Sequence, residues 1–223
     1  MKQPIIICGP HGGGTSFTTK MLRFSGLFVG ADVEPFSARK FHESKCFRDI
    51  NMRIFKVLGG DIHCGSENCL RRYVRNFQND SNVNNLLIEI ERSKDQLLNT
   101  FSSNDMSLLS KPWGWKDPRN SINLFFWTKI FPDSKILMIK KDERNKKSKS
   151  ASGRWFRTCS EYERNFYFNP SSVFDLNKCS QEVKVVNFEE ITTKQEKFDD
   201  MLEYCELGSV ELRMALKECG YEG

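Results

Sequence analysis

The residues best suited to chemistry lie in a glycine-rich stretch near the start of the chain. Its sequence is Gly9-Pro10-His11-Gly12-Gly13-Gly14-Thr15-Ser16. Glycines let several backbone N–H groups point at one spot, and the N-terminus of a following helix adds partial positive charge there. The hydroxyls of Thr15 and Ser16 add side-chain donors. We therefore expect a cradle for a phosphate or a group of similar shape, with an ordinary glycine-rich turn as the plainer alternative.

The spacing of this stretch is close to that of a nucleotide-binding P-loop. Gly9 and Gly14 fit the pattern G-x-x-x-x-G-K-[ST], but Thr15 stands where the pattern requires Lys. Kinases and ATPases use that lysine when they move a γ-phosphoryl group. A nucleotide-dependent phosphotransferase is therefore an alternative function, and Thr15 argues against it.

Basic residues follow two later apolar runs. Lys116-Asp117-Pro118-Arg119 comes after one run, and Lys140 ends the other, with Arg144 and Ser148 following at intervals of four. Positions four apart share one face of a helix, so Lys140, Arg144 and Ser148 are expected to be aimed at one point. We favour Lys116 over Arg119 for the site, because Arg119 can instead form a structural ion pair beside Asp117.

Short apolar segments are expected to be the strands that position these loops. They span 4–8, 112–116, 135–140 and 183–188. Segments predicted to be helical alternate with them, at 15–25, 46–58, 83–101, 120–131, 142–153 and near 209–219. The helix at 120–131 is expected to be amphipathic, with one apolar and one polar face. This alternation predicts one α/β domain over residues 1–223, with an open, mainly parallel sheet and helices on both faces. Ligands of such sheets bind beyond the carboxyl ends of the strands, so these loops should converge on one site.

The composition fits a globular protein that binds an anionic ligand. The chain has 223 residues, of which 28% are charged, and a formal net charge of +5 at pH 7. The basic residues are not concentrated in one tail, so a nucleic-acid partner is not expected. No apolar run is long enough to span a membrane and no signal peptide is recognisable, so a cytoplasmic location is expected.

The cysteines do not have the spacing of a metal site. They are Cys8, Cys46, Cys64, Cys69, Cys159, Cys179, Cys205 and Cys219. None forms a C-x-x-C pair, and His63 beside Cys64 has no second ligand pair at the usual spacing, so no metal is expected. Reduced thiols are the default for a cytosolic chain, with a bridge between Cys64 and Cys69 as the open alternative.

The glycine-rich stretch resembles the 5′-phosphosulfate loop of sulfotransferases, particularly the bacterial type that reads G-[MP]-H-R-S-G-T-S. Six of the eight positions are compatible, while Gly12 stands at the usual Arg and Gly13 at the usual Ser. Three later blocks also resemble that family, in the expected order. They are Trp115-Lys116-Asp117-Pro118-Arg119, the segment from Ile136 to Ser148, and Asn187-Phe188-Glu189-Glu190-Ile191.

This resemblance implies a sulfotransferase-like α/β fold and an enzyme that uses 3′-phosphoadenosine 5′-phosphosulfate (PAPS) as co-substrate. The residues it implies for PAPS binding are His11, Gly12, Gly13, Gly14, Thr15, Ser16, Lys140 and Ser148. Lys140 and Ser148 would hold the 3′-phosphate, with Lys140 in place of the usual Arg. Ser150 is the alternative register for Ser148.

The resemblance also implies catalytic roles. Lys116 would neutralise charge on the leaving group, because Gly12 and Gly13 offer no side-chain cation, and Lys20 is a weaker substitute. The segment 41–43 resembles the family's "FE" block, so Glu43 is the first choice for the base and His42 the second. The acceptor would be a hydroxyl or amine of a small molecule, carbohydrate or lipid. The glycine at position 12 also supports an alternative, a non-catalytic protein that keeps a nucleotide pocket.

Overall fold

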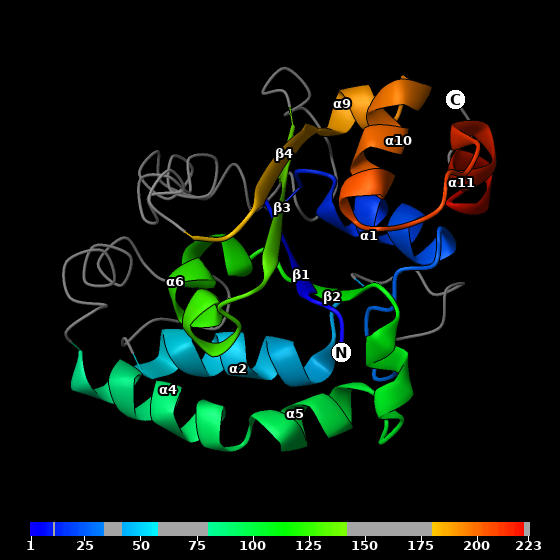
Figure 1. Cartoon of the computed structure of the whole chain (residues 1–223). Helices are drawn as coiled ribbons and strands as arrows, with labels where there is room; N and C mark the ends of the chain where they lie inside the picture. Colours follow the sequence, from blue (N-terminus) through cyan, green and yellow to red (C-terminus); the bar gives the residue numbers. More distant parts are fainter. Residues whose placement is uncertain (11, 34–41, 58–79, 142–179, 221–223) are drawn as a thin grey trace.

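The computed structural model describes residues 1–10, 12–33, 42–57, 80–141 and 180–220 (Figure 1). Four strands lie in these ranges: β1 (Pro4–Cys8), β2 (Trp113–Lys116), β3 (Lys135–Lys140) and β4 (Val183–Asn187). They form one sheet of order β2-β1-β3-β4 in which every neighbouring pair is parallel. The strands expected from the sequence are confirmed to within one residue at their ends.

Helices cover both faces of this sheet (Figure 1). Ile5 and Ile7 of β1 face one apolar cluster, and Ile6 and Cys8 face the other, as the period of two in a strand requires. The helices on the Ile5 face are α1 (Thr15–Phe24), α9 (Phe188–Ile191), α10 (Gln195–Tyr204) and α11 (Leu212–Glu218). Those on the Ile6 face are α2 (Lys45–Val57), α4 (Ser81–Arg92), α5 (Lys94–Phe101) and α6 (Asn120–Ile130). The predicted α/β architecture is therefore confirmed in these coarse terms.

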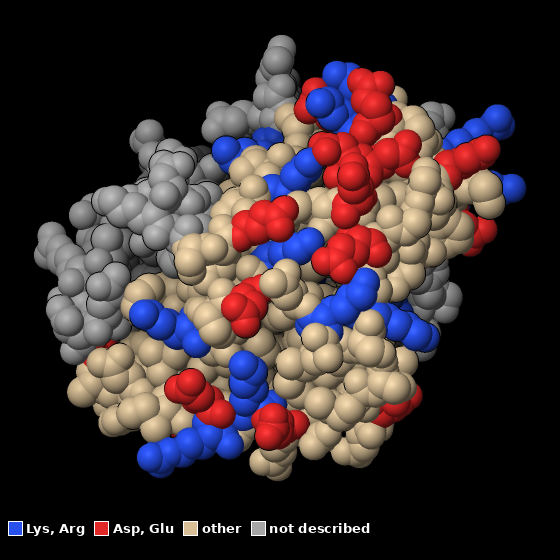
Figure 2. Space-filling view, viewed as in Figure 1, with Lys and Arg blue, Asp and Glu red and all other residues tan. Residues whose placement is uncertain are grey.

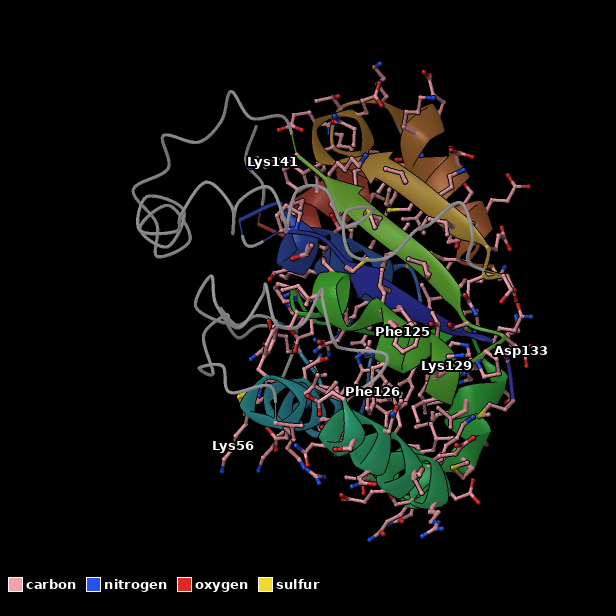
Figure 3. All side chains as sticks on the ribbon, turned by 90° about the vertical axis from the view of Figure 1, so that its left-hand side faces the viewer. Lys56, Phe125, Phe126, Lys129, Asp133 and Lys141 are labelled. Carbon is pink, nitrogen blue, oxygen red and sulfur yellow. The ribbon has the colours of Figure 1, made fainter. Side chains whose placement is uncertain are left out.

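Helix α6 is more deeply buried than the amphipathic helix that the sequence predicts. Every residue of α6 except Phe125 and Lys129 is buried, because β1 lies on one side of the helix and α2 and α4 pack on the other. Phe125 and Lys129, labelled in Figure 3, are one turn apart, and Lys129 Nζ lies 5.4 Å from the Phe125 ring centroid. The prediction of a polar face was wrong, since buried Asn and Ser side chains of α6 have polar partners inside the protein.

The single helix expected over 83–101 is two helices, α4 and α5, which meet at Ser93. Ser93 Oγ donates to the Glu89 carbonyl at 3.0 Å, a bond from a serine to the preceding turn that bends helices. A short 3₁₀ helix, η2 (Met106–Ser110), precedes β2. The expected helix at 142–153 lies outside the described residues, and the one near 209–219 is α11.

The strand order reverses at β1, and this places the site. The chain passes from β1 to β2 on one side and returns across β1 to β3 on the other. In open parallel sheets, ligands bind beyond the carboxyl ends of the strands at such a reversal. The glycine-rich stretch follows β1 there, and because the strands are parallel, β2, β3 and β4 end at the same edge. Within the described ranges, no helix has the length and apolar character needed to cross a membrane.

Candidate functional site

The described residues of the glycine-rich stretch, all but His11, lie in a tight connection between β1 and α1. The Gly9 N–H donates to Ser121 Oγ at 2.9 Å, and the Gly13 N–H donates to the Pro10 carbonyl at 2.9 Å. Gly12 and Gly14 have φ angles of 76° and 86°, which L side chains rarely adopt. Helix α1 begins at Thr15, directly after Gly14. The first N–H groups of a helix have no partner within it, so this geometry suits an anion at the start of α1.

Packing alone already requires glycine at two of these positions. A Cβ on Gly14 would lie 2.1 Å from Phe188 Cδ2, and one on Gly9 would lie 2.5 Å from the Ile139 carbonyl oxygen. Both neighbours come from the other half of the sheet edge, after β4 and within β3. These two glycines therefore bring the loop close to the ends of β3 and β4, and their identity is no evidence of ligand binding by itself.

Lys116, the last residue of β2, delivers a cation to the loop. Its Nζ donates to Ser16 Oγ at 2.9 Å and to Glu43 Oε1 at 3.0 Å. The Lys116 side chain is only 1% exposed. Burial lowers the pKa of the Lys116 ammonium, while the adjacent Glu43 carboxylate acts in the opposite direction. The structure thus brings together three residues that the sequence singled out: Ser16, Glu43 and Lys116.

A second cation lies behind this contact. Arg119 Nη2 lies 3.4 Å from Glu43 Oε2, and Arg119 Nε lies 2.8 Å from Asp117 Oδ1. The structural ion pair considered for Arg119 is therefore present. Asp117 Oδ2 is buried and, among the described residues, has no hydrogen-bond partner. Glu43 is held between Lys116 and Arg119, so its carboxylate has a fixed position beside the loop.

His42 is next to Glu43 in the sequence but has different neighbours. Its Nδ1 lies 2.8 Å from Arg23 Nη1 of α1. Burial lowers the pKa of His42 to about 4, helped by the positive charges of Arg23, Lys116 and Lys20. At neutral pH the ring is uncharged, and a base with so low a pKa accepts a proton poorly. The Lys20 Nζ lies 3.3 Å from the Cys219 carbonyl, at the end of α11.

The ends of β3 and β4 form the other half of the site. Lys140 is exposed, whereas Lys141 Nζ lies 4.7 Å from the centroid of the Phe188 ring. Figure 3 shows Lys141 at the carboxyl end of β3. Phe17 of α1 meets the same Phe188 ring edge-on, with 5.9 Å between centroids. The predicted ligands His11 and Ser148 lie outside the described residues.

Sequence reasoning missed the polar side chains of α6 and α2 that hold the end of β1, just before the loop. Asn120 Nδ2 donates to the Ile7 carbonyl at 3.0 Å and its Oδ1 accepts from Asn51 Nδ2 at 2.9 Å. Asn51 Oδ1 accepts from both Asn123 Nδ2 and Trp127 Nε1, at 2.8 and 2.9 Å. The sequence signal for this network was Asn51, which lies on an otherwise apolar face of its helix. A buried amide needs hydrogen-bond partners, so its position there indicates other buried polar side chains.

Charge elsewhere on the molecule is mixed. On the face seen in Figure 2, acidic side chains gather over α9 and α10, while lysines and arginines are spread between them. The acidic residues of α9 and α10 are Glu189, Glu190, Glu196, Asp199, Asp200 and Glu203. The candidate cations of the site come instead from the carboxyl ends of β2 and β3.

No protein-family model matches this chain, and no curated protein matches it. In the parts of the chain that the structure describes, no group of three or more His, Cys, Asp or Glu side chains is arranged to hold a metal ion. The arrangement that is present combines backbone N–H groups, a hydroxyl, a buried ammonium and a carboxylate. Such a set can bind a tetrahedral anion and handle a proton next to it.

Proposed function

We propose that this protein transfers a sulfuryl group from PAPS to a hydroxyl or amine of an acceptor. The observation that carries the proposal is the 2.9 Å contact between Lys116 Nζ and Ser16 Oγ. The loop has glycine at positions 12 and 13, and Lys116 supplies from β2 the side-chain cation that those positions lack. The position of the loop at the reversal of strand order also supports a nucleotide-sized ligand there.

Sulfuryl transfer makes demands similar to those of phosphoryl transfer. The acceptor oxygen or nitrogen forms a bond to sulfur, the bond from sulfur to the 5′-phosphate oxygen breaks, and negative charge develops on that phosphate. The protein must position the reactants and stabilise this charge. In the proposal, the backbone N–H groups of residues 12–16 hold the phosphosulfate, and Lys116 lies next to the leaving phosphate.

The acceptor must also lose a proton, and the geometry favours Glu43 over His42 for this role. Glu43 Oε1 is 3.0 Å from the Lys116 ammonium, so the base and the leaving-group cation are neighbours. His42 is directed to Arg23, and its lowered pKa makes it a poor acceptor of a proton at neutral pH. Glu43 is therefore the proposed base.

The same contact distinguishes the proposal from a P-loop phosphotransferase. In P-loop enzymes, the hydroxyl at the position of Ser16 binds Mg²⁺. Here the Ser16 hydroxyl accepts from the Lys116 ammonium, so a protein cation contacts the hydroxyl that a P-loop uses to bind the metal. This favours chemistry in which the loop uses a lysine rather than Mg²⁺.

The test is a calorimetric titration with PAPS, adenosine 3′,5′-bisphosphate and Mg-ATP, followed by transfer assays with labelled PAPS and hydroxyl acceptors. We expect PAPS and the bisphosphate to bind, and Lys116→Met to lower transfer by about 100-fold. Lys129→Met, which changes an exposed lysine of α6, is the matched control. Failure of both PAPS and adenosine 3′,5′-bisphosphate to bind would sink the proposal. Tight binding with no transfer to any acceptor would favour a non-catalytic protein, and ATP turnover with magnesium would favour a phosphotransferase.

A further inference from the structure

We infer that the Lys141 ammonium is a second cation that binds the anion held by the glycine loop, and that Phe188 positions it. Lys141 acts separately from its neighbour Lys140. The inference rests on the proposed function for the identity of the bound group, a 5′-phosphosulfate. Lys140 keeps the role expected from the sequence, at the more distant 3′-phosphate. Two adjacent lysines would thus serve the two ends of one ligand.

The alternation of side chains along β3 separates the two lysines. Ile136 and Met138 pack in the cluster on the α2 and α6 face, and Leu137 and Ile139 pack in the cluster on the α1 face. Continuing this period of two places position 140 with the former pair and position 141 with the latter. Helix α1 begins at the glycine loop and lies on the second face. Position 141 is therefore on the side from which the loop can be reached.

The Phe188 ring links Lys141 to the glycine loop. Its Nζ lies 4.7 Å from the centroid of the Phe188 ring. That ring packs so closely on Gly14 that a Cβ there would be 2.1 Å from Phe188 Cδ2. Phe17, in the first turn of α1, meets the same ring edge-on. A single aromatic ring thus contacts the Lys141 ammonium and the N-terminus of α1.

The two possible partners of Lys141 differ in strength. A cation is attracted to the face of a phenyl ring, but a phosphate or sulfate oxygen is a stronger partner because it carries charge and accepts hydrogen bonds. Lysine has a flexible four-carbon stem, so its ammonium can leave the ring for a nearby anion while its backbone stays in place. Phe188 is accordingly a positioning residue, which keeps the cation close to the loop without neutralising it.

The experiment compares ligands with and without the 3′-phosphate. Adenosine 5′-phosphosulfate lacks this group, and adenosine 3′,5′-bisphosphate carries it. We expect Lys141→Met to weaken both ligands by about tenfold, the effect of losing one charge-assisted hydrogen bond. Lys140→Met, the matched control, should weaken only the bisphosphate. Phe188→Leu should also weaken both, and Lys141→Met should have a smaller effect in the Phe188→Leu background.

The opposite patterns would overturn the inference. One is that Lys141→Met lowers the affinity only for the 3′-phosphorylated ligand. Another is that Lys140→Met lowers the affinity for both ligands. A third is that Lys141→Met has the same effect on affinity with and without Phe188→Leu. The proposed function fails if the wild-type protein binds Mg-ATP but does not bind PAPS, adenosine 5′-phosphosulfate or adenosine 3′,5′-bisphosphate. The affinities of Lys140→Met and Lys141→Met for Mg-ATP, which has no 3′-phosphate, are then measured. Only Lys141→Met should lower the affinity for Mg-ATP. A wild-type protein that binds none of these anions contradicts both proposals.

Discussion

The two halves of the sheet's carboxyl edge hold their cations in different ways. At the end of β2, Lys116 is 1% exposed and bonded to both Ser16 and Glu43. At the end of β3, Lys140 is exposed, and the next residue, Lys141, rests on an aromatic ring. The first half is a buried, connected polar network, whereas the second half keeps its charges near the surface.

Because of this difference, removing a cation should change the free energy of unfolding by different amounts in the two halves. A buried charge is tolerated only when it is paired and hydrogen-bonded, so losing one partner leaves the other uncompensated. An exposed charge is solvated and contributes little to folding. We therefore expect substitutions at the ends of β1 and β2 to lower the free energy of unfolding, and substitutions at the end of β3 to lower ligand affinity while the fold is kept.

The largest effect is expected where the two halves touch, at Gly14. Gly14→Ala places a Cβ 2.1 Å from Phe188 Cδ2 at a φ of 86°. The overlap and the left-handed backbone together should cost about 4 kcal/mol of unfolding free energy, measured by urea denaturation. Adding Phe188→Ala should relieve the overlap but not the backbone strain. Gly208→Ala is the control, because a Cβ there meets nothing within 4 Å. If Phe188→Ala rescues nothing, the two halves are not in contact as described.

Lys116→Met should be the next most costly change. It removes the ammonium that lies 3.0 Å from Glu43 Oε1, and breaking one side of a buried pair should lower the unfolding free energy by about 3 kcal/mol. The double variant Lys116→Met/Glu43→Gln removes both charges and should recover part of that loss. Lys140→Met should change the unfolding free energy by less than about 0.5 kcal/mol. Equal losses for the two lysines would remove the contrast between the halves.

The His42 imidazole gives the first half a dependence on pH. Its pKa falls from 6.5 to about 4 in the folded protein, so the unfolded chain binds a proton at a pH where the folded chain does not. Stability is therefore lost as pH falls from about 6.5 to about 4. The full shift corresponds to at most about 3 kcal/mol, and we expect about 2, since Arg23 can move away from a protonated ring.

The control for this effect is His42→Asn. Asparagine tolerates the positive φ of 53° at this position, and its side-chain oxygen can accept from Arg23, but it does not titrate. The unfolding free energy of the wild type should fall relative to this variant between pH 6.5 and pH 4. A constant difference over that range would show that His42 titrates normally in the folded protein.

Ser121→Ala should have the smallest effect. It leaves the Gly9 N–H without the acceptor that it has at 2.9 Å, and losing one such buried bond should cost about 1 kcal/mol. Ligand affinity should fall as well if this bond holds the loop in shape. Ser25→Ala is the comparison, because Ser25, directly after α1, donates from its Oγ to the carbonyl of Met21 in that same helix. A larger loss in Ser25→Ala would mean that the loop does not depend on α6.

Much of the fold could be predicted because its signals are local. Runs of β-branched residues bounded by turns, such as Ile5-Ile6-Ile7, predict buried parallel strands. The break between α4 and α5 and the burial of α6 could not be predicted in this way. The first depends on a side-chain bond of Ser93. The second depends on α2, α4 and β1 all packing around one helix, which no window of sequence contains.

For the site, the sequence by itself determined the types of residue: a glycine loop, hydroxyls, and basic residues at the ends of later strands. Only the tertiary structure decided which of them meet. Sheet order places β2 beside β1, and so brings Lys116 to Ser16, while Lys20 is directed to α11. It also gives two residues that are adjacent in the chain different partners, Arg23 for His42 and Lys116 for Glu43. The physical reason is that a charged side chain takes the nearest partner in space when it is buried, and spatial neighbours are set by packing rather than by sequence distance.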